Sequence, residues 1–292
     1  MKTRRAESSR DRNWLASGVL LLLLCAGLSK PAKGQCRDSD FVTEAPVAAA
    51  SRPTESSAPD PIQVGVTEVE MGYTHAWLAG SSSQNVMSSL VKLGVWCNIE
   101  LRWSATSFVS NGTPGTTQSG FGDNYLASQY RFHRETKQLP SMAAGYAVKF
   151  PSGNPVVGLG SGSTDHLAML MMGKNFKRMN AVANVNYFAI GQGQGQYDHK
   201  AEVTLDLTIP VKGRWGAIAE VYYDSHLNRE NAAYVGSTWG VTYTRNARLV
   251  FDGGVYAALS HGPGAPSNTL FVGVSYAVGT IYHRPPKKNP AE

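Results

Sequence analysis

Apolar and polar residues alternate with a period of two along most of the chain from residue 64 onward. The pattern is clearest at residues 200–211, KAEVTLDLTIPV, where apolar residues take the odd positions and charged or hydroxyl residues most of the even ones. Residues 215–224 and 139–150 repeat it. This period is typical of β-strands with unlike faces, and no amphipathic helix of useful length interrupts it.

The alternation and the turn residues between the alternating runs divide this region into strands. We predict twelve strands, at residues 64–76, 87–95, 98–107, 121–133, 139–150, 164–175, 179–190, 198–210, 213–225, 232–244, 247–259 and 268–281.

The predicted connections differ in length. Those after the even-numbered strands are short, such as residues 96–97 and 211–212, whereas those after the odd-numbered strands are longer and rich in Gly, Ser, Asn and Pro. Transmembrane barrels have short periplasmic turns, longer external loops and an even number of strands. The sequence therefore predicts an all-β fold, a twelve-stranded antiparallel transmembrane β-barrel. A soluble β-sandwich offers the same alternation and is the alternative.

Aromatic residues and mean hydropathy agree with the barrel. Mean hydropathy is only −0.23, but a closed barrel satisfies its backbone hydrogen bonds internally and needs no long apolar run. We expect interfacial girdles, which lie near strand ends, to include Trp77, Trp96, Trp103, Trp215, Trp239, Tyr223, Tyr243 and Tyr276.

The N-terminal region has the character of an export signal. Basic residues precede an apolar run at residues 14–28 that is too short to span a bilayer comfortably, and small residues precede Gln35. We predict a cleavable signal peptide at 1–34, a disordered periplasmic leader at 35–62, the barrel at 63–282 and a short tail at 283–292. An uncleaved membrane anchor is the alternative. The leader is rich in Ala, Ser and Pro, and we expect it to be too short and too polar to form a plug.

Charge argues against a nucleic-acid partner. The whole chain carries a formal net charge of +6, and the seven Lys/Arg and two Asp/Glu of residues 1–34 account for five of these charges. No basic stripe with interleaved aromatics survives cleavage.

Several segments resemble a known family. Residues 120–123 (GFGD), 130–132 (YRF), 139–153 (LPSMAAGYAVKFPSG) and 158–165 (GLGSGSTD) are similar to the outer-membrane barrels labelled "putative MetA-pathway of phenol degradation". The resemblance spans most of residues 64–282 and implies an outer-membrane channel. Its label implies an aromatic or hydrophobic solute.

If the apolar side chains face lipid, the opposite parity lines the lumen. The expected lumen-lining charged residues are Lys92, Glu100, Arg102, Lys149, Lys174, Lys200, Glu202, Asp206, Glu220, Arg248 and Asp252. They form either a polar constriction that passes or binds a small solute, or a plug-like network of mutual ion pairs.

Catalytic and metal signals are weak, so we predict no catalytic site, no metal site and no cofactor. The best Ser–His cluster is Asp165-His166 beside Ser161 and Ser163. The glycine runs at 158–163 and 191–196 lack nucleotide-loop spacing and are interpreted as flexible external loops. For Cys36 and Cys97 the default is two unpaired thiols, and a bridge between them is the alternative.

These observations lead to one functional prediction, a bacterial outer-membrane channel for passive uptake or efflux of small solutes. Expected partners are outer-membrane lipid, a small-molecule solute and the barrel-assembly machinery, and the sequence leaves the oligomeric state open. A non-transporting structural or surface-interaction barrel is the first alternative, and an outer-membrane lipid hydrolase is the second.

Overall fold

The computed structural model describes residues 36–78, 80–226, 233–260 and 268–281, so the predicted signal peptide and tail lie outside the described residues. By its contacts the chain divides into two units, residues 1–37 and 38–292. The second unit contains short 3-10 turns η1 (Asp38–Asp40) and η2 (Pro155–Val157) and thirteen strand segments. The strands are β1 (Val66–Leu78), β2 (Ser82–Trp96), β3 (Ile99–Thr113), β4 (Thr116–Gly120), β5 (Asn124–His133), β6 (Ser141–Phe150), β7 (Asp165–Phe176), β8 (Met179–Gly191), β9 (Tyr197–Lys212), β10 (Trp215–Asp224), β11 (Tyr234–Asn246), β12 (Leu249–Ala258) and β13 (Asn268–Thr280).

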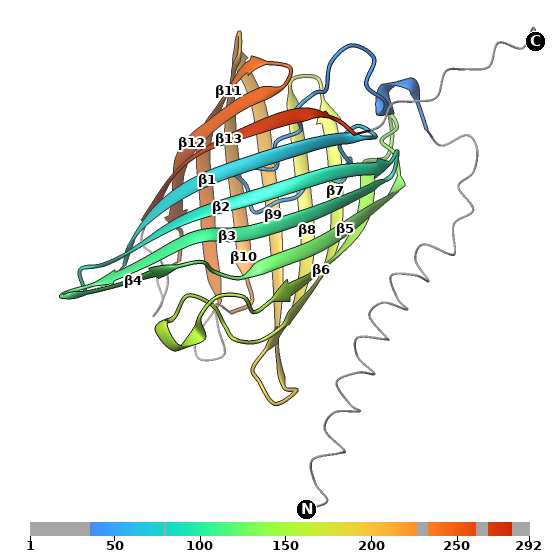
Figure 1. Cartoon of the computed structure of the whole chain (residues 1–292). Coiled ribbons are helices and arrows are strands. Elements are labelled where there is room, and N and C mark those ends of the chain that lie inside the picture. The colour runs from blue at the N-terminus through green and yellow to red at the C-terminus, as the bar shows by residue number, and fades with distance from the viewer. Residues whose placement is uncertain (1–35, 79, 227–232, 261–267, 282–292) are drawn as a thin grey trace, which may run out of the picture. The chain divides into compact units, whose positions relative to one another are not determined.

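The strands form one closed antiparallel sheet (Figure 1). Chain neighbours pair in turn around the wall, β1 pairs with β13, and the pairing of β2 with β3 completes the circle. β4 and β5 both pair with β3, β4 along its second half and β5 along its first. They therefore form one interrupted strand of the wall, broken at residues 121–123, and the barrel is twelve-stranded as predicted.

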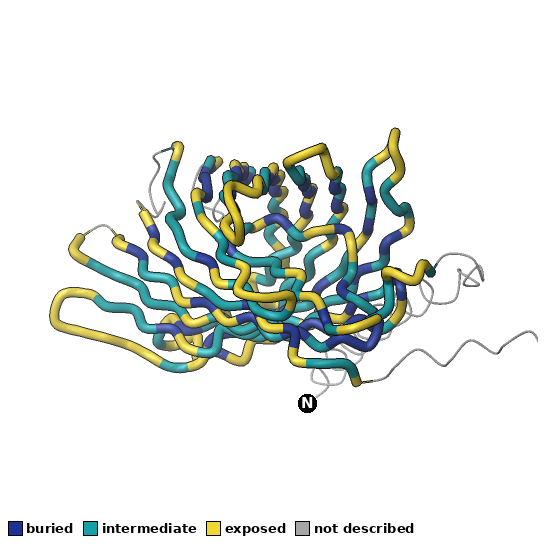
Figure 2. The backbone as a smooth tube through the Cα atoms, turned by 90° about the horizontal axis from the view of Figure 1, so that it is seen from above, coloured by how far each residue is buried: buried dark blue, intermediate teal, exposed yellow. Residues whose placement is uncertain are grey.

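Burial alternates along each strand and distinguishes the outer face of the wall from the inner face (Figure 2). On β9, Val203 and Leu205 are 46% and 52% exposed, whereas Thr204 and Asp206, which alternate with them, are 1% and 5% exposed. Apolar side chains therefore cover the outside and polar ones the inside, which is the reverse of a soluble sandwich. Because an outer surface of this kind needs a lipid environment, the sandwich alternative is excluded.

Two connections differ from the prediction. The turn after β1 occupies only residues 79–81, and the turn after β3 only Pro114 and Gly115, so β2, β3 and β4 extend further than expected. Gly80, Ser81 and Gly115 have positive φ angles, which tight hairpin turns require. The added strand residues, such as Ser82–Gln84, are mostly polar, so alternation gave no signal for them.

The remaining connections follow the expected pattern. We call the end where β1 begins and β13 ends the terminal rim, and the opposite end the loop rim. The turns at the terminal rim include residues 177–178, 213–214 and 247–248, while the link from β6 to β7 at the loop rim spans 151–164. Trp77, Trp96 and Trp215 are exposed at strand ends, whereas Trp103 and Trp239 lie further inside their strands.

Two further features complete the fold. Among the described residues, no helix has the length and apolar character to cross a membrane. Cys36 and Cys97 are disulfide-bonded, so the default expectation of two unpaired thiols is wrong.

Candidate functional site: the lumen and the segment inside it

Residues 49–62, here named the lumen segment, lie inside the barrel. Hydrogen bonds join the segment in turn to Glu70 on β1, Tyr256 on β12, Glu220 on β10 and Asn184 on β8. It then reaches β5, through Gln129, and Glu100 on β3. This order follows the order of strands around the wall, so the segment runs round the inner circumference. Figure 1 shows it in blue behind the front strands.

The structure therefore differs from the predicted disordered leader, because residues 49–62 are ordered against the inner wall. Sequence composition suggested disorder because the segment has few large apolar groups to bury. It is ordered instead by polar contacts, which the barrel supplies from distant strands.

Inward-facing carboxylates hold the segment by its backbone. Glu70 accepts the N–H groups of Ser51 and Arg52 at 2.9 and 3.1 Å. Glu220 accepts those of Glu55 and Ser56 at 3.0 and 2.8 Å. Glu68 and Glu100 hold the segment in the same way, through Ala49 and Ile62, both at 2.7 Å. Charge-assisted hydrogen bonds of this kind are stronger than neutral ones, and they satisfy donors that burial would otherwise leave unpaired.

A buried lysine links two of these carboxylates. Lys92 on β2 is 1% exposed, and its Nζ lies 2.6 Å from both Glu68 and Glu70, neither of which is exposed. The same Nζ donates to the carbonyl of Ala49 and to Ser51 Oγ. Lys92 therefore joins the wall to the segment as well as neutralising charge.

The side chain of Arg52 fills a hollow made by glycines. Gly72 and Gly273 face each other across β1 and β13. A Cβ added to either would come within 2.4 Å of the Arg52 side chain. Arg52 also lies 3.6 Å from Asp252 and 3.2 Å from Ser88 Oγ. The wall is thus shaped to receive this side chain.

The segment narrows the lumen and keeps one side in contact with water. Ala49, Glu55, Ala58 and Asp60 are exposed although their neighbours are bound to the wall. Glu55 precedes Ser56, which binds Glu220 near the middle of β10. The segment therefore has solvent-accessible side chains at mid-depth in the barrel.

The structure places most of the sequence-predicted charged residues on the inner face. Nine share this face: Lys92, Glu100, Arg102, Lys149, Lys200, Glu202, Asp206, Glu220 and Asp252. Many are paired, as Arg102 is with Glu100 and Lys200 with Asp224, both at 2.5 Å. Sequence reasoning missed Glu68, Glu70 and Arg131, although Glu68 and Glu70 share one parity of β1, and this was the signal available.

Two predicted residues do not line the lumen. Lys174 has the parity of the exposed Leu170 and lies at the terminal rim, where it binds the backbone of the β5–β6 turn and pairs with Glu135 at 3.3 Å. Burial opposes ionisation of Glu135, but hydrogen bonds from the side chain and backbone of Asn175 and from Lys174 outweigh it, so the pKa of Glu135 is lowered. Arg248 lies in the turn between β11 and β12.

The sequence motifs at residues 120–123 and 158–165 meet at the loop rim. Asp123 accepts the N–H groups of Gly153 and Ser161 at 2.9 and 3.0 Å. A Cβ at Gly160 would lie 2.5 Å from Asp123 Oδ1, so this close approach requires glycine. Lys149 reaches Asp123 at 3.7 Å and pairs with Asp165. The glycine-rich loop is therefore anchored, in contrast to the flexible loop expected.

The structure does not join His166 to the serines beside it in the sequence, and it forms a different Ser–His pair. His166 binds the hydroxyl of Tyr146 at 2.6 Å, not Ser161 or Ser163. At the loop rim, however, Ser225 Oγ lies 3.2 Å from His226 Nδ1, and His226 Nε2 lies 3.1 Å from Asp198.

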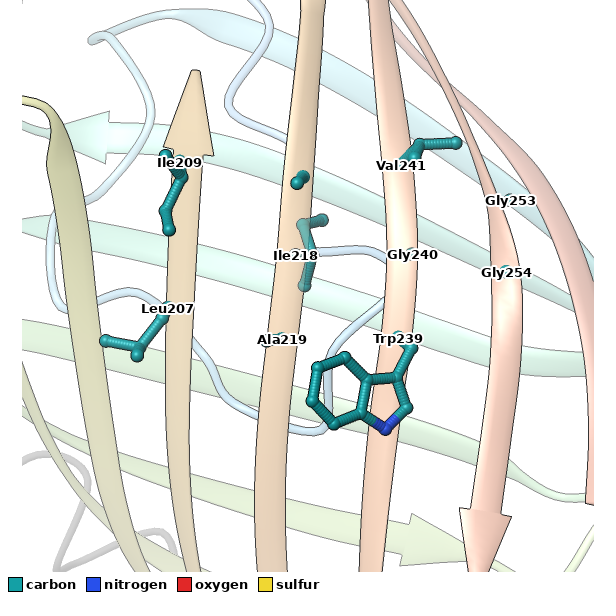
Figure 3. A pocket seen from close by; sticks show the side chains of 10 residues that line it. Leu207, Ile209, Ile218, Ala219, Trp239, Gly240, Val241, Gly253 and Gly254 are labelled. Atoms are coloured by element: carbon teal, nitrogen blue, oxygen red, sulfur yellow. The ribbon is translucent and has the colours of Figure 1, made fainter. Parts of the chain in front are cut away.

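A shallow apolar hollow on β9–β12 belongs to the outer face (Figure 3). Leu207, Ile209, Trp239 and Val241 surround it, and Gly253 leaves its floor without a side chain. Because these outward-facing residues belong to the apolar surface of the barrel, the hollow is separate from the lumen.

A closed antiparallel barrel with an apolar exterior and a charged interior defines a transmembrane barrel of the outer-membrane class. The chain belongs to the family described as "Putative MetA-pathway of phenol degradation", whose model matches residues 50–270. The resemblance noted from the sequence motifs is thereby confirmed.

Two solved structures have the same fold. The COG4313 outer membrane channel from Pseudomonas putida F1 is 11% identical, with a TM-score of 0.59, over 77% of this chain and 99% of that one. The NanC porin is 14% identical, with a TM-score of 0.50, over 72% of this chain and 98% of that one. At such identities the likeness concerns the fold alone. No curated protein sequence matches the chain.

Proposed function

We propose that the protein is a narrow outer-membrane channel for the passive passage of small solutes, with the lumen segment as its constriction. The terminal rim then faces the periplasm and the loop rim the exterior, which also accords with export by a cleaved signal peptide. The protein's partners are then outer-membrane lipid, the barrel-assembly machinery and the solute. One observation carries the proposal: the segment has exposed side chains at mid-depth inside a barrel with a charged inner wall.

Single-channel recording in planar bilayers tests this proposal. We compare the mature chain, beginning at Gln35, with a shortened chain beginning at Gln63, which lacks the lumen segment. The mature chain is expected to show small discrete openings, and the shortened chain larger ones because the constriction is gone. Correctly folded, heat-modifiable barrels that conduct in neither form would refute a channel function.

An aromatic solute is the finer part of the proposal. The family description names phenol degradation, and four ring side chains lie on the inner wall from β10 to β13. Tyr222 and Tyr234 have ring centroids 6.0 Å apart, and Tyr256 and Phe271 4.7 Å apart. Phenol added to one side should block or reduce the current, and a Tyr222→Leu variant should weaken this block. Block that is unchanged in the variant would contradict a role for these rings.

Two alternatives each have a specific observation in their favour. The extensive contacts of the lumen segment favour a structural barrel, which the recording above would reveal by absence of conductance.

The hydrogen-bonded set Ser225–His226–Asp198 favours a hydrolase. Ser225 Oγ also accepts the N–H of Ala201 at 3.0 Å, which commits part of its hydrogen-bonding capacity to the strand pairing. Hydrolysis of a p-nitrophenyl ester that is lost in Ser225→Ala would support this alternative, and the channel proposal expects none.

A further inference from the structure

The inner wall carries an excess of acidic side chains. Among the described residues, nine buried side chains are acidic and three are basic. The acidic ones are Glu68, Glu70, Glu100, Asp123, Glu202, Asp206, Glu220, Asp224 and Asp252, and the basic ones are Lys92, Arg131 and Lys149. Each of the three basic groups is already paired with two carboxylates. Arg102 and Lys200, which are half-buried on the same face, are each paired with one carboxylate, Glu100 and Asp224. The positive charges therefore have little capacity left for an incoming anion.

The contacts of the lumen segment show which kind of group the inner wall binds. Glu68, Glu70, Glu100 and Glu220 all receive N–H groups of the lumen segment. An ionised carboxylate accepts hydrogen bonds and donates none, so a solute that replaces these N–H groups must supply donors or positive charge.

One carboxylate is incompletely satisfied even with the segment in place. Asp206 is 5% exposed, and its Oδ1 has no hydrogen-bond partner, although Oδ2 accepts from Thr208 at 3.2 Å. Asp206 lies directly across from Glu220 on the neighbouring strand. Two ionised carboxylates in this position repel each other, and a cation in the lumen, like a proton, would relieve the repulsion.

The exposed side of the lumen segment adds charge of the same sign. Its exposed acidic side chains are Glu55 and Asp60, of which Asp60 is paired with Arg131 at 2.6 Å. Its one basic residue, Arg52, is held by Asp252 and the glycine hollow. The space that remains beside the segment is thus bordered by acidic groups from both the wall and the segment.

We propose that the lumen selects for cations, from alkali ions to alkylammonium compounds, and excludes small carboxylates. This inference rests on the proposed channel function and specifies its solute class. Neutral phenols are compatible with such a lumen, because a phenol hydroxyl has a pKa near 10 and is uncharged at neutral pH. Aromatic acids are not.

The reversal potential in a KCl gradient tests the selectivity. We expect K⁺ to permeate at least about threefold better than Cl⁻, because the acidic groups act within the Debye length of about 10 Å at 0.1 M salt. The double variant Glu55→Gln/Asp206→Asn should bring the ratio close to one. Glu135→Gln removes one carboxylate at the terminal rim, outside the lumen, and serves as the control, with little change expected. An open channel that prefers Cl⁻ or shows no preference would overturn the inference and leave the channel function intact.

A binding measurement gives the inference a second readout that needs no conductance. Spermidine is titrated calorimetrically into the detergent-folded mature chain and into the same double variant. Saturable binding that weakens several-fold in the variant, but not in Glu135→Gln, supports a cation-binding lumen even if the chain does not conduct. Absence of binding to a correctly folded mature chain, or binding unaffected by the double variant, refutes it.

Discussion

Replacing Lys92 by Met should destabilise the barrel strongly. Lys92 is buried between Glu68 and Glu70, with Nζ 2.6 Å from each. Methionine preserves the apolar stem of the side chain and removes its charge. Two adjacent carboxylates then remain buried without a counterion, a loss that typically costs about 3–5 kcal/mol.

The contacts that remain in the variant place the expected loss of stability at about 3 kcal/mol, the lower end of this range. Glu68 keeps the N–H of Ala49, and Glu70 keeps those of Ser51 and Arg52, so neither carboxylate loses all of its partners. One of the two can also take up a proton. We therefore expect a loss of about 3 kcal/mol in the free energy of unfolding.

Reversible urea unfolding in lipid vesicles, followed by tryptophan fluorescence, measures this loss. Lys212→Met provides the control, because Lys212 is exposed at the end of β9. Adding Glu68→Gln to Lys92→Met should recover part of the stability, since the two residues face each other and their effects should not be additive. A loss below about 1 kcal/mol, or strict additivity, would refute the view that this buried triad is electrostatically coupled.

Three further substitutions test other parts of the structure. Leu205→Arg, on the outer face near the middle of β9, should cost about 2–4 kcal/mol in the same unfolding assay, because it places a charge in lipid; a cost near zero would contradict a lipid-facing surface there. Gly273→Val should displace the Arg52 side chain and increase single-channel conductance, whereas Gly279→Val, with open space around its Cβ, should not; equal effects would argue against the glycine hollow. Asp123→Asn should weaken the hold on the external loop by about 1–3 kcal/mol and accelerate its cleavage by thermolysin, and unchanged cleavage would show that other contacts hold the loop.

The charged residues of the lumen were partly predictable. Parity along a strand gave the inner face for Glu202, Asp206 and Glu220, because side chains two residues apart point to the same side. It failed for Lys174, because β7 carries apolar residues on both faces, such as the exposed Leu170 and the buried Met171. It also failed for Arg248, which lies in a turn. Periodicity is a property of the strand interior, so it loses its meaning at the rims.

The external motif shows a different limit. The sequence placed Gly120–Asp123 and Gly158–Asp165 in separate segments and offered no reason to join them. Asp123 joins them in the folded chain because the break between β4 and β5 turns its carboxylate toward two backbone N–H groups of the loop. Contacts between a carboxylate and backbone N–H groups depend on position and leave almost no trace in residue type.

By itself, the sequence determined the twelve-stranded barrel. Alternation with a period of two is local, and it is repeated in strand after strand, so errors at individual boundaries did not alter the strand count or the fold. Only the tertiary structure decided that residues 49–62 lie inside the barrel. The segment has too little apolar surface to indicate burial, and the groups that hold it, including Glu70, Glu220 and Glu100, come from strands that meet around it only when the barrel closes.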